Sequence, residues 1–141
     1  MVRAFMLLAA ALVAAPVLAQ SAADAAQGYA LEASASPAAV KVGEAGRVAV
    51  TIRPRAPTWH VHPQAPLRVQ LEAPSGLKLE RRELGRKDVA DPKADALRFE
   101  SPFVATAAGA QPVRAKVDFF ICSDTACVKQ VKDVAIPVTV Q

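Results

Sequence analysis

Hydrophobic and polar residues alternate over several segments of the chain. In residues 47–53 the valines and the isoleucine occupy every second position, and arginine, alanine or threonine fills the positions between and beside them. A period of two places successive side chains on opposite faces of an extended strand. Residues 67–72, 113–121 and 134–140 repeat the pattern. The sequence therefore predicts half-buried strands in these four segments.

Short clusters with glycine or proline separate these segments. They lie at residues 43–46, 54–57, 74–76, 91–92 and 109–112, at intervals that suit the turns of an antiparallel sheet. Roughly seven to nine short strands in a chain of this length are typical of two packed sheets. We therefore expect one all-β domain, an immunoglobulin-like antiparallel β-sandwich over residues 29–141.

Two segments have a less regular pattern. Pro137 interrupts the last alternating run, which suits an edge strand or a bulge because proline has no N–H to donate. Residues 79–84 are compatible with a helical turn as well as with a strand.

The N-terminal residues follow neither pattern. Arg3 precedes an apolar run over residues 5–15, and small residues lead up to Ala19. These features indicate a signal peptide, residues 1–19, with cleavage after Ala19. The apolar run is shorter than the ~20 residues of a membrane-spanning helix, so no stable membrane span is expected. Export would place the mature protein in the periplasm, where disulfides persist, with the small and polar residues 20–28 as a flexible leader.

Composition and charge narrow the function only slightly. Hydrophobic residues make up 52% of the 141 residues, and the excess lies largely in residues 1–19 and in alanine. The formal net charge is +4 with both signs interspersed, which is too mild a balance for a nucleic-acid surface. The densest charged run, residues 78–88, mixes both signs and is expected at a solvated strand edge and loop.

Two cysteines flank residues 123–126, which lie between two predicted strands. If this segment is a hairpin turn, Cys122 and Cys127 are close enough to bond. Strand parity puts Cys122 on the face opposite Ile121, and therefore outside the sandwich core. Closing so short a ring stabilises the fold by roughly 2 kcal/mol, and accessible bridges are typical of labile disulfides. A structural bridge and a redox pair are both compatible with the spacing.

The charges near the two sulfurs differ. Asp124 follows Cys122, whereas Lys129 and Lys132 follow Cys127. A cation close to a thiol favours its thiolate. We therefore expect Cys127 to be the attacking sulfur.

A second candidate group is the run Trp59-His60-Val61-His62. On a strand, His60 and His62 project from the same face, an arrangement in which two imidazoles bind one ion. With reduced cysteines they would form a His2Cys2 site for zinc or copper. The simpler interpretation is two exposed strand histidines beside a tryptophan, because an HxH pair alone is a weak signal and oxidised cysteines are not ligands.

The order of these segments resembles a known family. Its most specific part is the hairpin FFICSDTAC at residues 119–127, followed by the closing strand VAIPVTV at 134–140 and preceded by WHVHP at 59–63. Over residues 29–141 the chain resembles the N-terminal periplasmic domain of the transmembrane thiol:disulfide interchange protein DsbD. The resemblance implies an immunoglobulin-like domain whose cysteine pair passes electrons to thioredoxin-fold periplasmic proteins.

The resemblance also implies roles for individual residues. Cys122 and Cys127 match the redox pair, and Cys127 matches the cysteine that forms mixed disulfides with partners. The residues expected at the binding rim are Trp59, His60, His62 and Phe120. A cap loop over residues 86–95, including Asp88 and Asp91, would shield the pair.

The chain departs from the family pattern in three places. The cap segment has no aromatic residue, four rather than five residues separate the cysteines, and Val128-Lys129 replaces a Pro-Pro pair. Shielding of the disulfide is therefore expected to be weaker than in the family.

The sequence leads to one main functional hypothesis and two alternatives. The main hypothesis is a periplasmic thiol:disulfide exchange domain that needs no cofactor and no metal. Because no membrane segment or thioredoxin-like domain follows residue 141, we expect its electron donor and its client to be separate proteins, which makes it a relay more than an independent enzyme. The alternatives are a secreted β-sandwich binding module with a structural disulfide, and a copper- or zinc-binding protein that uses His60, His62 and the cysteines.

Overall fold

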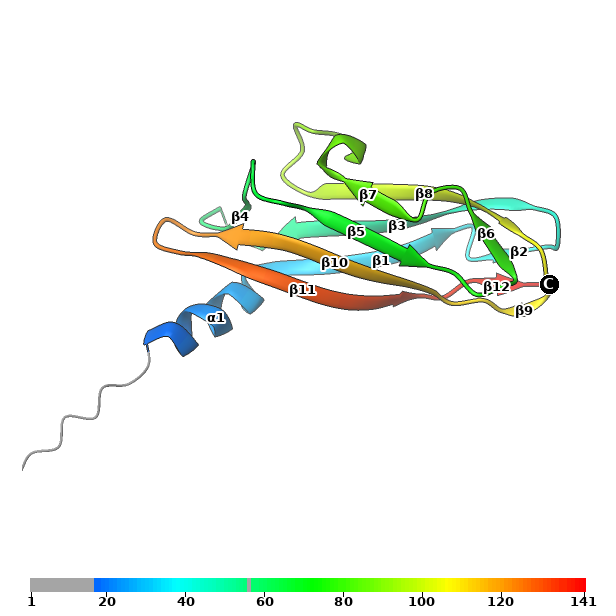
Figure 1. Cartoon of the computed structure of the whole chain (residues 1–141), viewed down its shortest axis with the longest axis horizontal. Helices are drawn as coiled ribbons and strands as arrows, with labels where there is room; N and C mark the ends of the chain where they lie inside the picture. Colours follow the sequence, from blue (N-terminus) through cyan, green and yellow to red (C-terminus); the bar gives the residue numbers. More distant parts are fainter. Residues whose placement is uncertain (1–16, 56) are drawn as a thin grey trace, which may run out of the picture.

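The computed structural model describes residues 17–55 and 57–141. Two antiparallel sheets pack face to face along the length of the molecule (Figure 1). This arrangement confirms the predicted all-β, immunoglobulin-like sandwich. The strands are β1 (Tyr29–Ser36), β2 (Ala39–Val40), β3 (Ala45–Pro54), β4 (His60–Val61), β5 (Arg68–Glu72), β6 (Leu77–Leu79), β7 (Glu83–Gly85), β8 (Leu97–Ala105), β9 (Gly109–Ala110), β10 (Val113–Cys122), β11 (Cys127–Ile136) and β12 (Thr139–Val140).

The strands form three sheets. The first has the order β1-β3-β8-β6, and the second has the order β11-β10-β5-β7, with β4 also pairing with β10. A small third sheet, β2-β12-β9, lies at the end of the sandwich that holds the C-terminus (Figure 1). Strand β10 is therefore internal to the second sheet, whereas β11 is one of its edges.

The predicted alternation places the core between the two main sheets. In β10 the side chains of Val113, Val117, Phe119 and Ile121 are fully buried, as the pattern predicted. The opposite sheet contributes Phe99 and Phe103, which with Phe119 are the largest fully buried side chains. Burial of these alternating residues stabilises the sandwich because each removes its apolar surface from water.

The segment 79–84 forms no helical turn. Strand β6 ends at Leu79 in the first sheet and β7 begins at Glu83 in the second, so the segment crosses between the sheets. Leu79 and Leu84 are both buried, and their packing in opposite sheets holds the connection extended. The backbone N–H of Arg81 donates to Ser101 Oγ (3.2 Å), and this hydroxyl donates to the Arg81 carbonyl (2.7 Å).

The last predicted strand is split at Pro137. Strand β11 ends at Ile136, and β12 pairs with β2 in parallel and with β9 antiparallel in the third sheet. Proline has no N–H for the ladder, so the chain leaves the second sheet at this point. Pro137 was expected on an edge strand or at a bulge. In the structure it follows the last residue of the edge strand β11, where the predicted strand is broken.

The N-terminal part differs from the expected flexible leader. Most of the predicted signal peptide, residues 1–16, lies outside the described residues, and α1 (Val17–Gln27) is helical. Ala25 is fully buried and belongs to the core, and the Gly28 N–H donates to the Ala25 carbonyl (3.1 Å). Alanine has the highest helix propensity, which explains the helix. No helix in the described ranges is long and apolar enough to cross a membrane.

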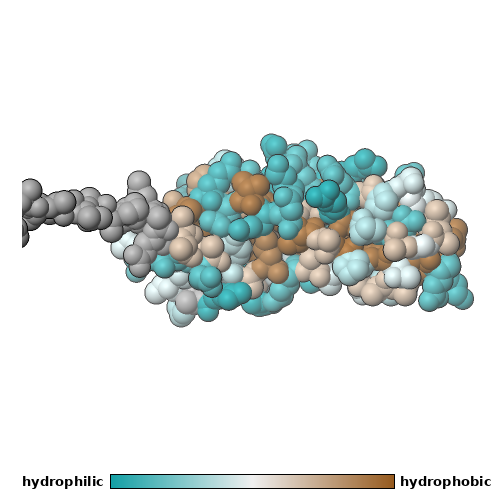
Figure 2. Space-filling model, turned by 90° about the horizontal axis from the view of Figure 1, so that it is seen from below, coloured by the Kyte–Doolittle hydropathy of each residue, from teal (hydrophilic) through white to brown (hydrophobic). Residues whose placement is uncertain are grey.

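The face shown in Figure 2 carries apolar side chains along a band through its middle, with polar side chains on both margins. Exposed large apolar residues are few and separated; those in the described ranges are Val42, Val104 and Val131. Scattered exposed residues of this kind are normal on a small domain.

Candidate functional site

The disulfide closes the β10–β11 hairpin. Cys122 ends β10, Cys127 begins β11, and the two residues are register partners with a Cα–Cα distance of 4.1 Å. The turn between them is closed by the Ser123 N–H, which donates to the Ala126 carbonyl (2.8 Å). The expected hairpin, and with it the bond between the cysteines, is therefore present.

The two half-cystines differ in burial. Cys122 is 1% exposed, whereas Cys127 is exposed to solvent. The reason is the strand order: β10 has β11 on one side and β4 on the other, but β11 is an edge strand. Cys122 lies outside the apolar core cluster, as parity predicted, but it is not accessible. Only the Cys127 side of the bridge is open to an incoming thiol.

Three of the predicted rim side chains share the outer face of the sheet with Cys122. His60 is its register partner on β4, while Ile121 pairs with Val61. The His62 N–H donates to the Phe120 carbonyl (2.9 Å), which extends the same register by one more pair. Because side chains alternate along a strand, His60, His62 and Phe120 lie on the face of Cys122. The structure thus brings together three of the four residues expected at the binding rim.

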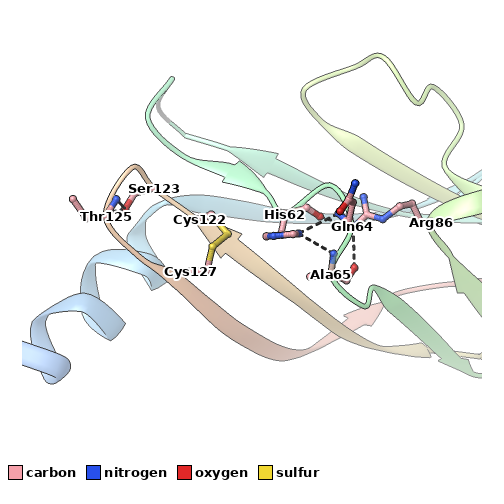
Figure 3. The surroundings of a disulfide bond; sticks show 8 residues. All are labelled: His62, Gln64, Ala65, Arg86, Cys122, Ser123, Thr125 and Cys127. Carbon is pink, nitrogen blue, oxygen red and sulfur yellow. Dashed lines mark hydrogen bonds between the residues drawn. A yellow bond between two sulfur atoms is a disulfide. The ribbon is translucent and has the colours of Figure 1, made fainter.

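The imidazole of His62 is held by the turn that follows it. Its Nδ1 accepts hydrogen bonds from the backbone N–H of Gln64 (3.1 Å) and of Ala65 (2.8 Å). A ring nitrogen that accepts two hydrogen bonds carries no proton, so the ring proton lies on Nε2. Figure 3 shows this second nitrogen on the side of the ring that faces Cys122.

The segment expected to form the cap contacts this turn through its first residue. Arg86 Nη2 donates to the carbonyl oxygens of His62 (2.6 Å) and Ala65 (3.1 Å). The contact fixes the connection between β4 and β5 against the short 3-10 helix η1 (Arg86–Asp88). Sequence reasoning gave Arg86 no role, because the contact joins residues more than twenty positions apart and involves only backbone acceptors.

The two acidic residues of the predicted cap act within their own loop. Asp88 accepts a hydrogen bond from the Gly85 N–H (2.8 Å) and pairs with Arg81 (2.7 Å). These contacts hold the pKa of the Asp88 carboxyl below its usual value, with the Gly85 hydrogen bond as the largest cause. Asp91 accepts from the Lys93 N–H (2.9 Å). Among the hydrogen bonds and ion pairs of the described chain, neither carboxylate reaches the cysteines.

Trp59, the fourth residue expected at the rim, packs away from the sulfurs. Its ring lies against the backbone of Gly28, where an added Cβ would come within 2.5 Å of Trp59 Cδ2, and it contacts the apolar core. With His60, Asp95 and neighbouring residues it lines an open cavity of about 440 Å³. Trp59 therefore packs against the core and Gly28, and borders a hollow that His60 also lines.

The lysines contribute less to the chemistry of Cys127 than the sequence indicated. Lys129 Nζ pairs with Asp118 Oδ2 at 3.3 Å, which offsets its charge. Lys132 is an odd number of residues from Cys127 on β11 and therefore lies on the other face of the strand. The difference in burial between the sulfurs is thus a stronger basis than charge for assigning Cys127 as the accessible one.

The structure gives no support to the metal-binding alternative. His60 and His62 share a face, but His62 uses Nδ1 within its own turn, and both sulfurs are in the disulfide. The described residues contain no group of three or more histidine, cysteine, aspartate or glutamate side chains that could hold a metal ion.

Comparisons with known proteins add little to this picture. No protein-family model and no curated protein matches the sequence. One solved structure with weak similarity is AggA, the major subunit of aggregative adherence fimbriae type I from Escherichia coli, with 11% identity, a TM-score of 0.33, and coverage of 80% of this chain and 94% of that one.

Proposed function

We propose that the protein is a periplasmic thiol:disulfide exchange domain that uses the Cys122–Cys127 pair. The observation that carries the proposal is the position of the bridge: it lies outside the apolar core cluster, with one half-cystine buried and the other exposed on an edge strand. A bridge that fastens two sheets together would have both sulfurs in the core. An accessible bridge in a small ring is typical of labile disulfides.

The exchange reaction follows from the accessibility of Cys127. A reduced donor attacks the Cys127 sulfur, the bond to Cys122 breaks, and the second thiol of the donor then releases Cys127 as a thiolate. The reduced Cys127 attacks the disulfide of an oxidised client, and Cys122 resolves the mixed disulfide. Each cycle moves two electrons from donor to client. The resemblance to the DsbD N-terminal domain supports thioredoxin-fold proteins as clients and a thioredoxin-like domain as donor.

A trapping experiment tests the proposal. A Cys122→Ser protein, with Cys127 free and unable to be resolved, is expected to accumulate disulfide-linked complexes with thioredoxin-fold proteins in a periplasmic extract. The matched control is Cys127→Ser, in which the remaining sulfur is buried and should trap little. The absence of reducible complexes with Cys122→Ser would contradict the proposal.

The reduction potential separates exchange from a purely structural bridge. Structural disulfides of secreted proteins lie below about −300 mV, where physiological thiols do not reduce them. We expect a less negative value for the Cys122–Cys127 pair. A value below that limit would favour the alternative of a binding module with a structural disulfide.

A further inference from the structure

The buried sulfur of the bridge has a polar neighbour whose orientation the fold determines. Register places His62 on the outer face beside Cys122, and Figure 3 shows its ring directed toward the disulfide. The Gln64 and Ala65 N–H groups occupy Nδ1, so the nitrogen on the side of Cys122 carries the proton. A neutral imidazole held in this way presents a hydrogen-bond donor, not an acceptor, to the sulfur.

We propose that His62 stabilises Cys122 as the leaving thiolate, and so determines which sulfur is attacked and which departs. This inference rests on the exchange function proposed above. An attacking thiolate forms a new S–S bond with Cys127, the Cys122–Cys127 bond breaks, and its electron pair remains on Cys122. The negative charge then develops on a sulfur that is buried from water, where an unpaired charge is costly. The His62 Nε2–H offsets that cost by donating to the thiolate.

Arg86 is the positioning residue behind this donor. It donates to the carbonyl oxygens at both ends of the turn, those of His62 and Ala65. These contacts keep the Ala65 N–H in place to hold Nδ1. Arg86 therefore acts on the sulfur only through His62, and its effect depends on the imidazole being present.

Two substitutions of His62 distinguish the loss of its Nε2–H donor from the loss of its Nδ1 acceptor in the turn. In His62→Asn the amide oxygen retains an acceptor for the Gln64 and Ala65 N–H groups, but the shorter side chain has no donor at the Nε2 position. In His62→Gln the amide nitrogen lies about where Nε2 does. The comparison variant is His60→Asn, on the same face of the sheet, where the imidazole is exposed and is the direct register partner of Cys122 but accepts no hydrogen bond from the turn.

The measurement is the rate at which dithiothreitol reduces the oxidised full-length proteins, followed by alkylation and mass spectrometry. His62→Asn is expected to slow reduction about tenfold, the loss of one hydrogen bond to a charged group, while His62→Gln restores part of the lost rate and His60→Asn slows reduction less than His62→Asn does. Reduction of His62→Asn at the wild-type rate, or equal slowing by His60→Asn, would overturn the proposal.

A second measurement identifies the leaving sulfur. Oxidised protein treated with glutathione and then alkylated is expected to carry glutathione on Cys127 and the alkyl group on Cys122. The reverse pattern would overturn the assignment. Arg86→Gln should slow reduction in the wild-type background but add little to His62→Asn, since coupled residues are not additive; additive effects would contradict the positioning role.

These measurements are independent of a physiological partner. If the trapping experiment fails while His62→Asn still slows reduction by dithiothreitol, the exchange function is wrong and the role of His62 stands. If trapping succeeds and His62→Asn has no effect, the exchange function stands and the role of His62 is wrong.

Discussion

Cys122 and Cys127 lie directly opposite each other across the β10–β11 hairpin, 4.1 Å apart at Cα, yet only Cys127 is exposed. The disulfide therefore has one accessible end. The difference in exposure arises from strand order. Strand β10 is flanked by β11 on one side and by β4 on the other, whereas β11 lies at the edge of the sheet. Any thiol that reaches this bridge meets Cys127 first.

The bridge is expected to stabilise the domain only moderately. Replacing both cysteines, in Cys122→Ala with Cys127→Ala, should lower the free energy of unfolding by about 2 kcal/mol, because the ring that it closes is short. Urea denaturation of the oxidised protein and the double variant measures the difference. Loss of the folded state on removing the bridge would show that it is a structural fastening.

The contact between Trp59 and Gly28 is expected to be sensitive to a single methyl group. Gly28→Ala would place a Cβ within 2.5 Å of the indole, and such overpacking costs about 1–3 kcal/mol. The fluorescence of Trp59, the chain's one tryptophan, should change with it. Gly85→Ala is the control, because the nearest atom to its added Cβ is at an ordinary 3.6 Å; equal losses in both variants would contradict this account.

The buried pair of Tyr29 and Gln130 is expected to matter at alkaline pH. Tyr29 OH donates to Gln130 Oε1 (2.8 Å), so Tyr29→Phe leaves a buried acceptor unpaired at a cost of about 1–2 kcal/mol. Burial raises the pKa of Tyr29 above its ordinary value. The stability linked to the phenol is thus complete below that ordinary value and is lost as pH rises through the folded pKa.

Urea midpoints of wild type and Tyr29→Phe at neutral and alkaline pH test this linkage. The gap between the two proteins should narrow as the pH rises, because the chain has no other tyrosine. A gap that is independent of pH would show that the phenol does not ionise differently in the folded and unfolded states.

The carboxylate of Asp88 is expected to make the loop before β8 acid-sensitive. The Gly85 N–H and Arg81 lower its pKa, so its contribution to stability is present above the ordinary carboxyl range and is lost as pH falls through the folded pKa. Asp88→Asn should be about 1 kcal/mol less stable than the wild type at neutral pH. In acid this difference should shrink, because the wild-type carboxylate is then protonated as well. Thermal denaturation across the acidic range measures this.

Glu32→Gln is the matched control for that substitution. Glu32 also has a lowered pKa, because Arg53 donates to it, but the pair is exposed on β1 and exposed pairs contribute little. The acid dependence of stability should therefore differ from that of the wild type more in Asp88→Asn than in Glu32→Gln. Equal differences in the two variants would contradict the special role of the loop contact.

Much of the fold could be predicted from local pattern. The alternation in residues 113–121 gave the buried face of β10, and the position of Cys122 outside the core followed from the same count. The segment 79–84 could not be assigned in this way. Its extended form depends on Leu79 and Leu84 packing in different sheets, and no local pattern records that.

The candidate site likewise has a part that could be predicted from the sequence and a part that could not. That His60 and His62 share a face follows from a period of two, which the backbone imposes on any strand; that Cys122 lies on the same face follows from the pairing of β4 with β10. The burial of Cys122, the direction of the His62 ring and the contact of Arg86 with its carbonyl depend on how β4, the turn after it and η1 meet. Those are contacts between segments distant in the chain, made through backbone groups that every residue carries. The sequence by itself determined which two cysteines are able to pair and which side chains of a strand share a face. Only the tertiary structure decided which cysteine is open to solvent and which nitrogen of His62 faces the buried one.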